Sequence, residues 1–133
     1  MPYFYSERSR ARLEQCHPDL QKVFNVVIQY YDCTILQGHR QEAEQNELFE
    51  QGLSKLQWPH SKHNKMPSLA VDVTPYPVDW DDTARHYYFA GLVLGIASMM
   101  GVKLRWGGNW DGDLEFKDQT FNDLVHFELV KGE

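Results

Sequence analysis

Two short stretches, Leu69-Ala70-Val71-Asp72-Val73-Thr74 and Leu124-Val125-His126-Phe127-Glu128-Leu129, carry most of the information about the architecture. In both, apolar residues alternate with other residues. That alternation predicts strands with two different faces, because successive side chains of a strand point to opposite sides. One face of each strand is therefore apolar, and we expect helices to cover it. The opposite face presents Asp72 from the first strand and His126 from the second.

Helical periodicity surrounds these strands. Pro18 suits the first position of a helix, and the apolar residues that follow it at helical spacing are Leu20, Val23, Phe24, Val27, Ile28 and Tyr31. A second helix is predicted over residues 42–51, and Gly52 ends it. Asp81 or Asp82 can cap a long helix that runs to about Met100. Its apolar stripe is predicted to be Phe89, Leu92, Val93, Ile96 and Met100.

Further strands are predicted over residues 33–37 and 102–106, and loops over 53–68 and 107–122. Together these elements predict an α+β fold. We expect a small, mainly antiparallel sheet with helices on one face and a functional site on the other. The length of 133 residues fits one domain, so residues 1–133 are taken as a single unit.

Composition limits the classes of partner. The chain has 13 basic and 19 acidic residues, a formal net charge of −6, which argues against nucleic acid and anionic membranes as partners. Two cysteines, Cys16 and Cys33, are too few for a disulfide framework. The first residues lack the basic and then apolar order of a signal peptide. We therefore expect synthesis in the cytosol, with no membrane partner.

A third metal-competent side chain, His63, precedes the Asp72 strand. Two imidazoles and one carboxylate would leave the fourth position of a tetrahedral zinc ion to water, whose pKa falls to about 7. Asp123 lies three residues before His126, where it could act as a general base without binding the metal. Taken one at a time, these residues also suit ordinary roles, such as a surface histidine, a strand-end cap or a turn aspartate. Spacing alone leaves both interpretations open.

The same residues resemble the VanY-like zinc peptidases. This family includes D-Ala-D-Ala carboxypeptidases, D-Ala-D-Ala dipeptidases and the L-alanyl-D-glutamate endopeptidases of phage lysis systems. The segments that carry the resemblance, over roughly residues 18–130, are Gln37-Gly38-His39-Arg40 with Glu44-Gln45 and Leu48, Ser61-Lys62-His63, Ala70-Val71-Asp72, Trp106-Gly107-Gly108-Asn109-Trp110 and Asp123-Leu124-Val125-His126. Each segment is weak alone, but all of them occur in the family's order. The resemblance implies a hedgehog/D-Ala-D-Ala peptidase-like fold.

The resemblance also implies roles for individual residues. It places Zn²⁺ on His63, Asp72 and His126. It makes Asp123 the acid–base residue that activates water and later protonates the leaving amine. Arg40 would hold a carboxylate or carbonyl of the substrate, and Ser61 would bind substrate or orient the site. Glu128 competes as the base, but it is better placed as a residue that orients a metal ligand.

Two departures from the family pattern bear on specificity. Eight residues separate His63 from Asp72, more than in many relatives, and we expect the extra length around Met66-Pro67-Ser68 to bulge toward solvent. The acidic position holds Asp123, whereas the dipeptidase branch tends to use Glu. The second departure favours the endopeptidase branch and hence the L-Ala–D-Glu bond, with D-Ala–D-Ala as the alternative.

The implied substrate is the peptide stem of peptidoglycan, cleaved by a monomeric catalytic domain. The expected route is synthesis in the host cytoplasm followed by access to the cell wall through a holin-made hole. Trp58, Trp110 and Tyr76 are candidates for the walls of the substrate groove, whereas Trp106 suits the core better. Two rival hypotheses are a non-catalytic, zinc-stabilised binding domain of the hedgehog type and an HNH-type nuclease built on His60 and His63-Asn64.

Overall fold

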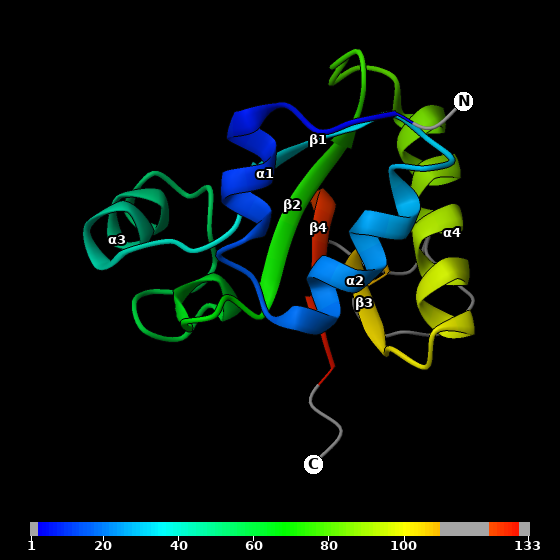
Figure 1. Cartoon of the computed structure of the whole chain (residues 1–133). Coiled ribbons are helices and arrows are strands. Elements are labelled where there is room, and N and C mark those ends of the chain that lie inside the picture. The colour runs from blue at the N-terminus through cyan, green and yellow to red at the C-terminus, as the bar shows by residue number, and fades with distance from the viewer. Residues whose placement is uncertain (1–2, 110–122, 131–133) are drawn as a thin grey trace.

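The computed structural model of the chain describes residues 3–109 and 123–130 and confirms the α+β prediction (Figure 1). The elements in chain order are α1 (Glu7–Leu13), α2 (Pro18–Val27), β1 (Cys33–Gln37), α3 (Glu42–Glu50), the 3-10 turn η1 (Lys62–Asn64), β2 (Ala70–Pro75), α4 (Thr83–Met99), β3 (Leu104–Gly107) and β4 (Asp123–Leu129). Residues 110–122 of the predicted loop, Trp110 among them, lie outside the described residues.

The four strands form one antiparallel sheet in the order β1-β2-β4-β3. The register of its central pair sets Val71 opposite Phe127 and Asp72 opposite His126. Directly opposed residues of an antiparallel pair project from the same face. The apolar pair therefore lies on one side of the sheet, and the two metal-competent side chains lie together on the other.

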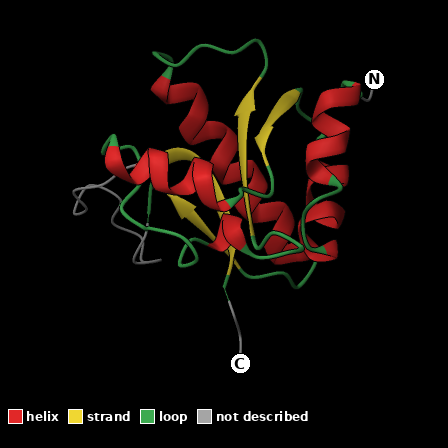
Figure 2. Ribbon diagram, turned by 90° about the vertical axis from the view of Figure 1, so that its left-hand side faces the viewer, coloured by secondary structure: helices red, strands yellow, loops and turns green. Residues whose placement is uncertain are grey.

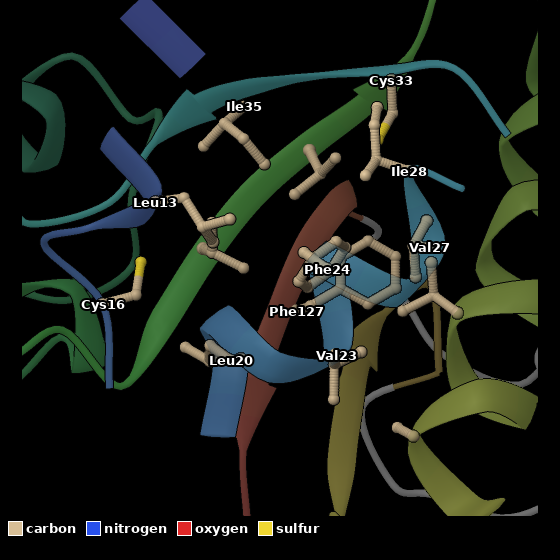
Figure 3. Close-up of a cluster of buried hydrophobic side chains, with 14 of the residues drawn as sticks. Leu13, Cys16, Leu20, Val23, Phe24, Val27, Ile28, Cys33, Ile35 and Phe127 are labelled. Atoms are coloured by element: carbon tan, nitrogen blue, oxygen red, sulfur yellow. The ribbon is translucent and has the colours of Figure 1, made fainter. Parts of the chain in front are cut away.

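Three helices cover the apolar side of the sheet. Figure 1 shows α1 and α2 in front of the strands, with α4 alongside them. Phe127 of β4 meets Phe24 of α2 and Phe89 of α4, with ring centroids 5.6 Å and 6.2 Å apart. Figure 3 shows Phe24 and Phe127 in the middle of the apolar cluster, with Val23, Val27 and Ile28 beside them. This packing fixes the backbone of β4 and hence the point from which the His126 side chain projects.

Polar caps define where the helices begin. Ser6 accepts a hydrogen bond from the Ser9 amide at the start of α1. Pro18 occupies the first turn of α2, as predicted. Asp82, rather than Asp81, caps α4 by accepting a bond from the Arg85 amide. Such caps satisfy amides that have no partner inside the helix.

Two features of the helices differ from the sequence expectation. Helix α1 was not predicted, because only Ser9 and Leu13 of its residues are buried and no apolar stripe marks it. The buried face of α4 consists of His86, Phe89, Ala90, Val93 and Ala97. The predicted stripe is therefore wrong at its end, where Met100 is 38% exposed. This helix is apolar on most sides, so its sequence hardly distinguishes one face from another.

Helix α3 lies apart from the other helices at one side of the sheet (Figure 1), and Figure 2, viewed from that side, shows it crossing in front of the strands. It contributes no side chain to the hydrophobic core. Among the described helices, none combines the length and apolar character needed to cross a bilayer.

Candidate metal centre

Three side chains from separate elements meet on the polar side of the sheet. His63 comes from η1, Asp72 from β2 and His126 from β4. His63 Nε2 lies 3.2 Å from Asp72 Oδ1 and 3.3 Å from His126 Nδ1, and His126 Nδ1 lies 3.3 Å from Asp72 Oδ1. Zinc–ligand distances of about 2.0–2.2 Å imply separations of about 3.3–3.6 Å between tetrahedral ligands. The three atoms therefore form a triangle of the size that a tetrahedral metal ion requires.

The outer nitrogen of each imidazole has an acceptor of its own. His63 Nδ1 lies 2.7 Å from the carbonyl oxygen of Gly38, and His126 Nε2 lies 2.8 Å from Glu128 Oε1. A carbonyl or carboxylate oxygen can only accept, so each outer nitrogen donates, and in the neutral ring the inner nitrogen then carries the lone pair. Two lone pairs and a carboxylate oxygen thus converge on one point. This donor set fits a divalent cation.

The electrostatics of the metal-free site reflect this convergence. Burial opposes ionisation of Asp72, but the electrostatic interaction with His63 and hydrogen bonds with His126 and His63 outweigh it, so the pKa of Asp72 lies well below its usual range. Burial lowers the pKa of His126, but its hydrogen bonds to Asp72 and Glu128 outweigh this and raise the pKa to about 9. Without a metal ion, a proton on His126 therefore offsets the nearby carboxylates.

Glu128 is held by two cations. Its Oε2 lies 3.3 Å from Lys62 Nζ and 3.3 Å from Arg105 Nε. Burial raises the pKa of Glu128, but the hydrogen bond and charge of His126, followed by Lys62 and Arg105, lower it overall. An ionised Glu128 that accepts from His126 Nε2 fixes the tautomer and the ring orientation of that histidine. This geometry accords with the ligand-orienting role expected for Glu128.

His63 is placed by a capped turn. Ser61 precedes η1, and its hydroxyl accepts a bond from the His63 amide at 3.2 Å. The Ser61 amide donates to Asn64 Oδ1 at 3.1 Å, which completes a capping box. Ser61 is 5% exposed and lines the cleft described below. In this structure its hydroxyl orients the backbone of a candidate ligand.

The segment between His63 and Asp72 follows its expectation only in part. Met66 is 68% exposed, as expected for a bulge toward solvent. Ser68, in contrast, is fully buried, and its single hydroxyl proton points between the carbonyl oxygens of Ala70, 2.6 Å from Oγ, and of Gly38, 3.2 Å from it. A buried hydroxyl needs such partners, and these bonds tie the segment to the carbonyl that holds His63.

A cleft of about 420 Å³ opens beside the candidate metal site. Its lining includes Arg40, Ser61, His63, Asp123, His126 and Glu128. Asp123, the first residue of β4, is placed where Gly107 of β3 pairs with it. Burial first, and then the negative charge of Asp72, raise the pKa of Asp123. A partly buried carboxyl group with a raised pKa in a cleft suits proton transfer.

Arg40 is 8% exposed and lies between the site and two glutamines. Its Nη2 is 3.6 Å from Asp72 Oδ2. Gln37 Oε1 accepts from Nε at 3.0 Å and from Nη2 at 2.8 Å, and Gln45 Oε1 accepts from Nη1 at 2.9 Å. The family-like motif included both glutamines, but nothing in the motif indicated what they contact. The signal available in the sequence was their position, with one glutamine on each side of Arg40 in the motif.

The walls of the cleft differ from the expectation of an aromatic groove. Within the described part of the chain, its apolar lining is provided by Leu53 and Leu56, and neither Trp58 nor Tyr76 belongs to it. Trp106 is buried in the core, as its alternating strand suggested, and its Nε1 donates to the carbonyl of Leu124.

Comparisons with known proteins identify the family of this chain. A family model described as phage L-alanyl-D-glutamate peptidase matches residues 1–130. The L-alanyl-D-glutamate peptidase of Escherichia phage T5 is 30% identical over 138 residues, which cover 98% of this chain and 100% of that protein. The crystal structure of the Serratia marcescens L-Ala D-Glu endopeptidase ChiX matches with a TM-score of 0.77 and 28% identity, over 96% of this chain and 90% of that one.

The resemblance predicted from the sequence motifs is thereby confirmed. Because the family model spans almost the whole chain and the fold agrees with a solved endopeptidase, the chain belongs to the phage L-alanyl-D-glutamate peptidase family.

Proposed function

We propose that residues 1–133 form a monomeric, zinc-dependent peptidase that hydrolyses the L-Ala–D-Glu bond in the peptide stem of peptidoglycan. The observation that carries the proposal is the triangle of lone-pair atoms on His63, Asp72 and His126 at the edge of a cleft. The names of the relatives support the reaction and the bond. Release to the cell wall through a holin-made hole remains part of the proposal.

The donor set favours zinc among divalent ions. Two imidazole nitrogens and one carboxylate oxygen are ligands that suit zinc, and catalytic zinc sites commonly use three protein ligands. Zinc bound by these residues would lower the pKa of water to about 7 and polarise the scissile carbonyl. His63 and His126 are held for this task by Gly38 and Glu128.

Asp123 is proposed to move the proton. It would accept a proton from the attacking water and deliver it to the nitrogen of the leaving amine, as general acid–base catalysis requires. Its raised pKa, caused by burial and by Asp72, brings the carboxyl group closer to the working range of such a catalyst. Arg40 would hold a carboxylate or the developing oxyanion of the stem peptide, and Ser61 would help to align the same groups.

The test is digestion of purified peptidoglycan by the zinc-loaded protein, followed by mass spectrometry of the products. Fragments with a new N-terminal D-Glu are expected. Released D-Ala would instead indicate the D-Ala–D-Ala bond, and zinc binding without any cleavage would favour the non-catalytic binding domain.

Two variants test the residue roles. Asp123→Asn should bind zinc and fold as the wild type but lose about 10²–10⁴-fold in kcat, whereas His126→Ala should lose the metal. The exposed Asp81→Asn serves as a matched control. Turnover of Asp123→Asn at near the control rate would contradict the role given to Asp123.

A further inference from the structure

Helix α3 is attached to the protein through a polar side chain. All nine of its residues are described, and Gln45 is the one among them that is buried, at 0% exposure. A fully buried carboxamide is costly unless every polar atom has a partner. Gln45 therefore marks a position where the protein uses hydrogen bonds in place of apolar packing.

The Gln45 carboxamide makes as many hydrogen bonds as its chemistry allows. Its Oε1 accepts from Arg40 Nη1 at 2.9 Å and from Asn64 Nδ2 at 3.2 Å. Its Nε2 donates to Ser54 Oγ at 2.9 Å and to the carbonyl of Leu56 at 2.5 Å. Two donors and two acceptor lone pairs are the full inventory of this group. If the carboxamide were flipped, its Nε2 donors would face the donors of Arg40 and Asn64, so its orientation is fixed.

These four bonds connect parts of the cleft that come from different segments of the chain. One partner is the candidate substrate-binding Arg40, and another is Asn64 in the turn that carries His63. The other two lie on the wall at residues 53–56, whose Leu53 and Leu56 are 66% and 46% exposed. Burial in the core therefore does not position this wall.

We propose that Gln45 is a positioning residue for substrate binding, which sets the Arg40 guanidinium at a fixed separation from the wall at residues 53–56. This inference rests on the proposed function, because the ligand is the carboxylate-bearing stem peptide that Arg40 would hold. A stem peptide bound between the guanidinium and the wall would contact both. If Gln45 no longer held them, the spacing between these two contacts would no longer match the peptide. The four side-chain hydrogen bonds of Gln45 all go to residues other than the three candidate metal ligands. Asn64 keeps its bonds to the Arg40 carbonyl and the Ser61 amide.

The first test compares Gln45→Met with Gln51→Met, an identical change at an exposed position just beyond α3. Methionine has a similar length but none of the four hydrogen bonds. For Gln45→Met we expect KM for a stem peptide to rise at least tenfold, kcat to change less than threefold and zinc affinity to change less than threefold. Gln51→Met should match the wild type. An unchanged KM in Gln45→Met, or an equal loss in kcat and zinc affinity, would overturn the proposal.

The second test is a double-mutant cycle with Arg40→Ala. If Gln45 sets Arg40 relative to the wall, Gln45→Met should raise KM by a smaller factor in the Arg40→Ala background than in the wild type, because coupled residues are not additive. Effects that multiply would overturn the proposal. The conservative Gln45→Glu keeps the acceptors for Arg40 and Asn64 but loses the donors to the wall. It should recover part of the lost KM.

A third measurement does not need activity. The Arg40 Nη1–H signals in NMR spectra, whose nitrogen donates to Gln45 Oε1, should exchange slowly with water in the wild type and in Gln51→Met, and faster in Gln45→Met. Equal exchange in all three would overturn the positioning role. Failure of the wild type to cleave the stem peptide would contradict the proposed function, whereas cleavage with unchanged KM in Gln45→Met would overturn only the role of Gln45.

Discussion

His126 is the residue at which a proton and the proposed metal ion would compete for the same atom. Its Nδ1 faces Asp72 and His63, and its Nε2 faces Glu128. In the metal-free chain these carboxylates raise its pKa to about 9. A metal ion can bind Nδ1 only after the proton has left.

We therefore predict that zinc affinity increases with pH up to about 9. The His126 proton alone accounts for up to about tenfold per pH unit in the range below that pKa. Competition with a chromophoric chelator at pH 6, 7 and 8 measures the slope. An affinity that is flat over this range would show that His126 is already neutral in the metal-free protein.

The same raised pKa has the opposite effect on the metal-free fold. A group whose folded pKa of about 9 exceeds its unfolded value of about 6.5 adds stability that is complete below pH 6.5. That stability is lost as the pH rises through about 9. Zinc affinity and metal-free stability should therefore change in opposite directions with pH.

At this scale the sequence was sufficient for some residues and insufficient for others. Strand alternation placed Asp72 and His126 on one face, and motif order added His63. Sequence patterns could not identify the Gly38 carbonyl that holds His63, because a backbone atom has no signature in the sequence. They also could not identify the role of Gln45, because the sequence does not show whether a glutamine side chain is buried or solvated.

Among the elements, the pairing of β3 with β4 positions the candidate acid–base residue. Gly107 pairs with Asp123, and a Cβ at Gly107 would lie 2.1 Å from the Asp123 carbonyl oxygen. A backbone carbonyl cannot give way as the end of a flexible side chain can. Only glycine fits this close approach without moving Asp123.

Gly107→Ala should therefore shift Asp123 and lower kcat by at least about tenfold, since small displacements of a catalytic group are costly. Zinc affinity should stay within about threefold, because the three candidate ligands are not touched. Gly91→Ala, at an exposed helical position with open space around it, is the matched control. Wild-type kcat in Gly107→Ala would show that the strand pair tolerates the methyl group.

The elements also show where periodicity stops being informative. Helix α1 attaches through polar contacts, with the Ser9 hydroxyl accepting from the Ile35 amide and Arg12 donating to the Ile35 carbonyl. No apolar stripe accompanies such a helix, so a search for helical periodicity misses it. Helix α4 has the opposite problem, because it is apolar on most sides and buries the small residues Ala90 and Ala97.

For the molecule as a whole, we expect metal binding and stability to be linked. The candidate ligands come from η1, β2 and β4, so an ion bound to them would connect three separate parts of the chain. A ligand that binds the folded state alone, at about a hundred times its Kd, stabilises it by about 2.7 kcal/mol. We predict that zinc raises Tm by several degrees and that chelation reverses the rise.

Calorimetry with and without zinc measures this shift. His126→Ala should remove the zinc-dependent shift, whereas the exposed Asp81→Asn should keep it. A zinc-dependent rise in His126→Ala equal to that of the wild type would place the stabilising ion elsewhere.

Charge is distributed unevenly over the molecule. The chain carries a formal net charge of −6, yet Arg40, Lys55 and Lys62 all line the cleft, against the two carboxylates Asp123 and Glu128. Net charge alone made an anionic substrate an awkward partner for this chain. The three cations lie where the proposed stem peptide would bind, and a ligand responds to the local potential of the cleft rather than to the total charge.

Strand β4 comes after every other described element in the chain, yet it lies inside the sheet, between β2 and β3. During translation, a nascent chain that stops before β4 lacks both the centre of the sheet and the imidazole of His126. Every earlier polypeptide on the ribosome is therefore without a complete metal site. Among the described elements, the sheet and the candidate metal site are therefore completed in the same step, when the chain has extended through β4.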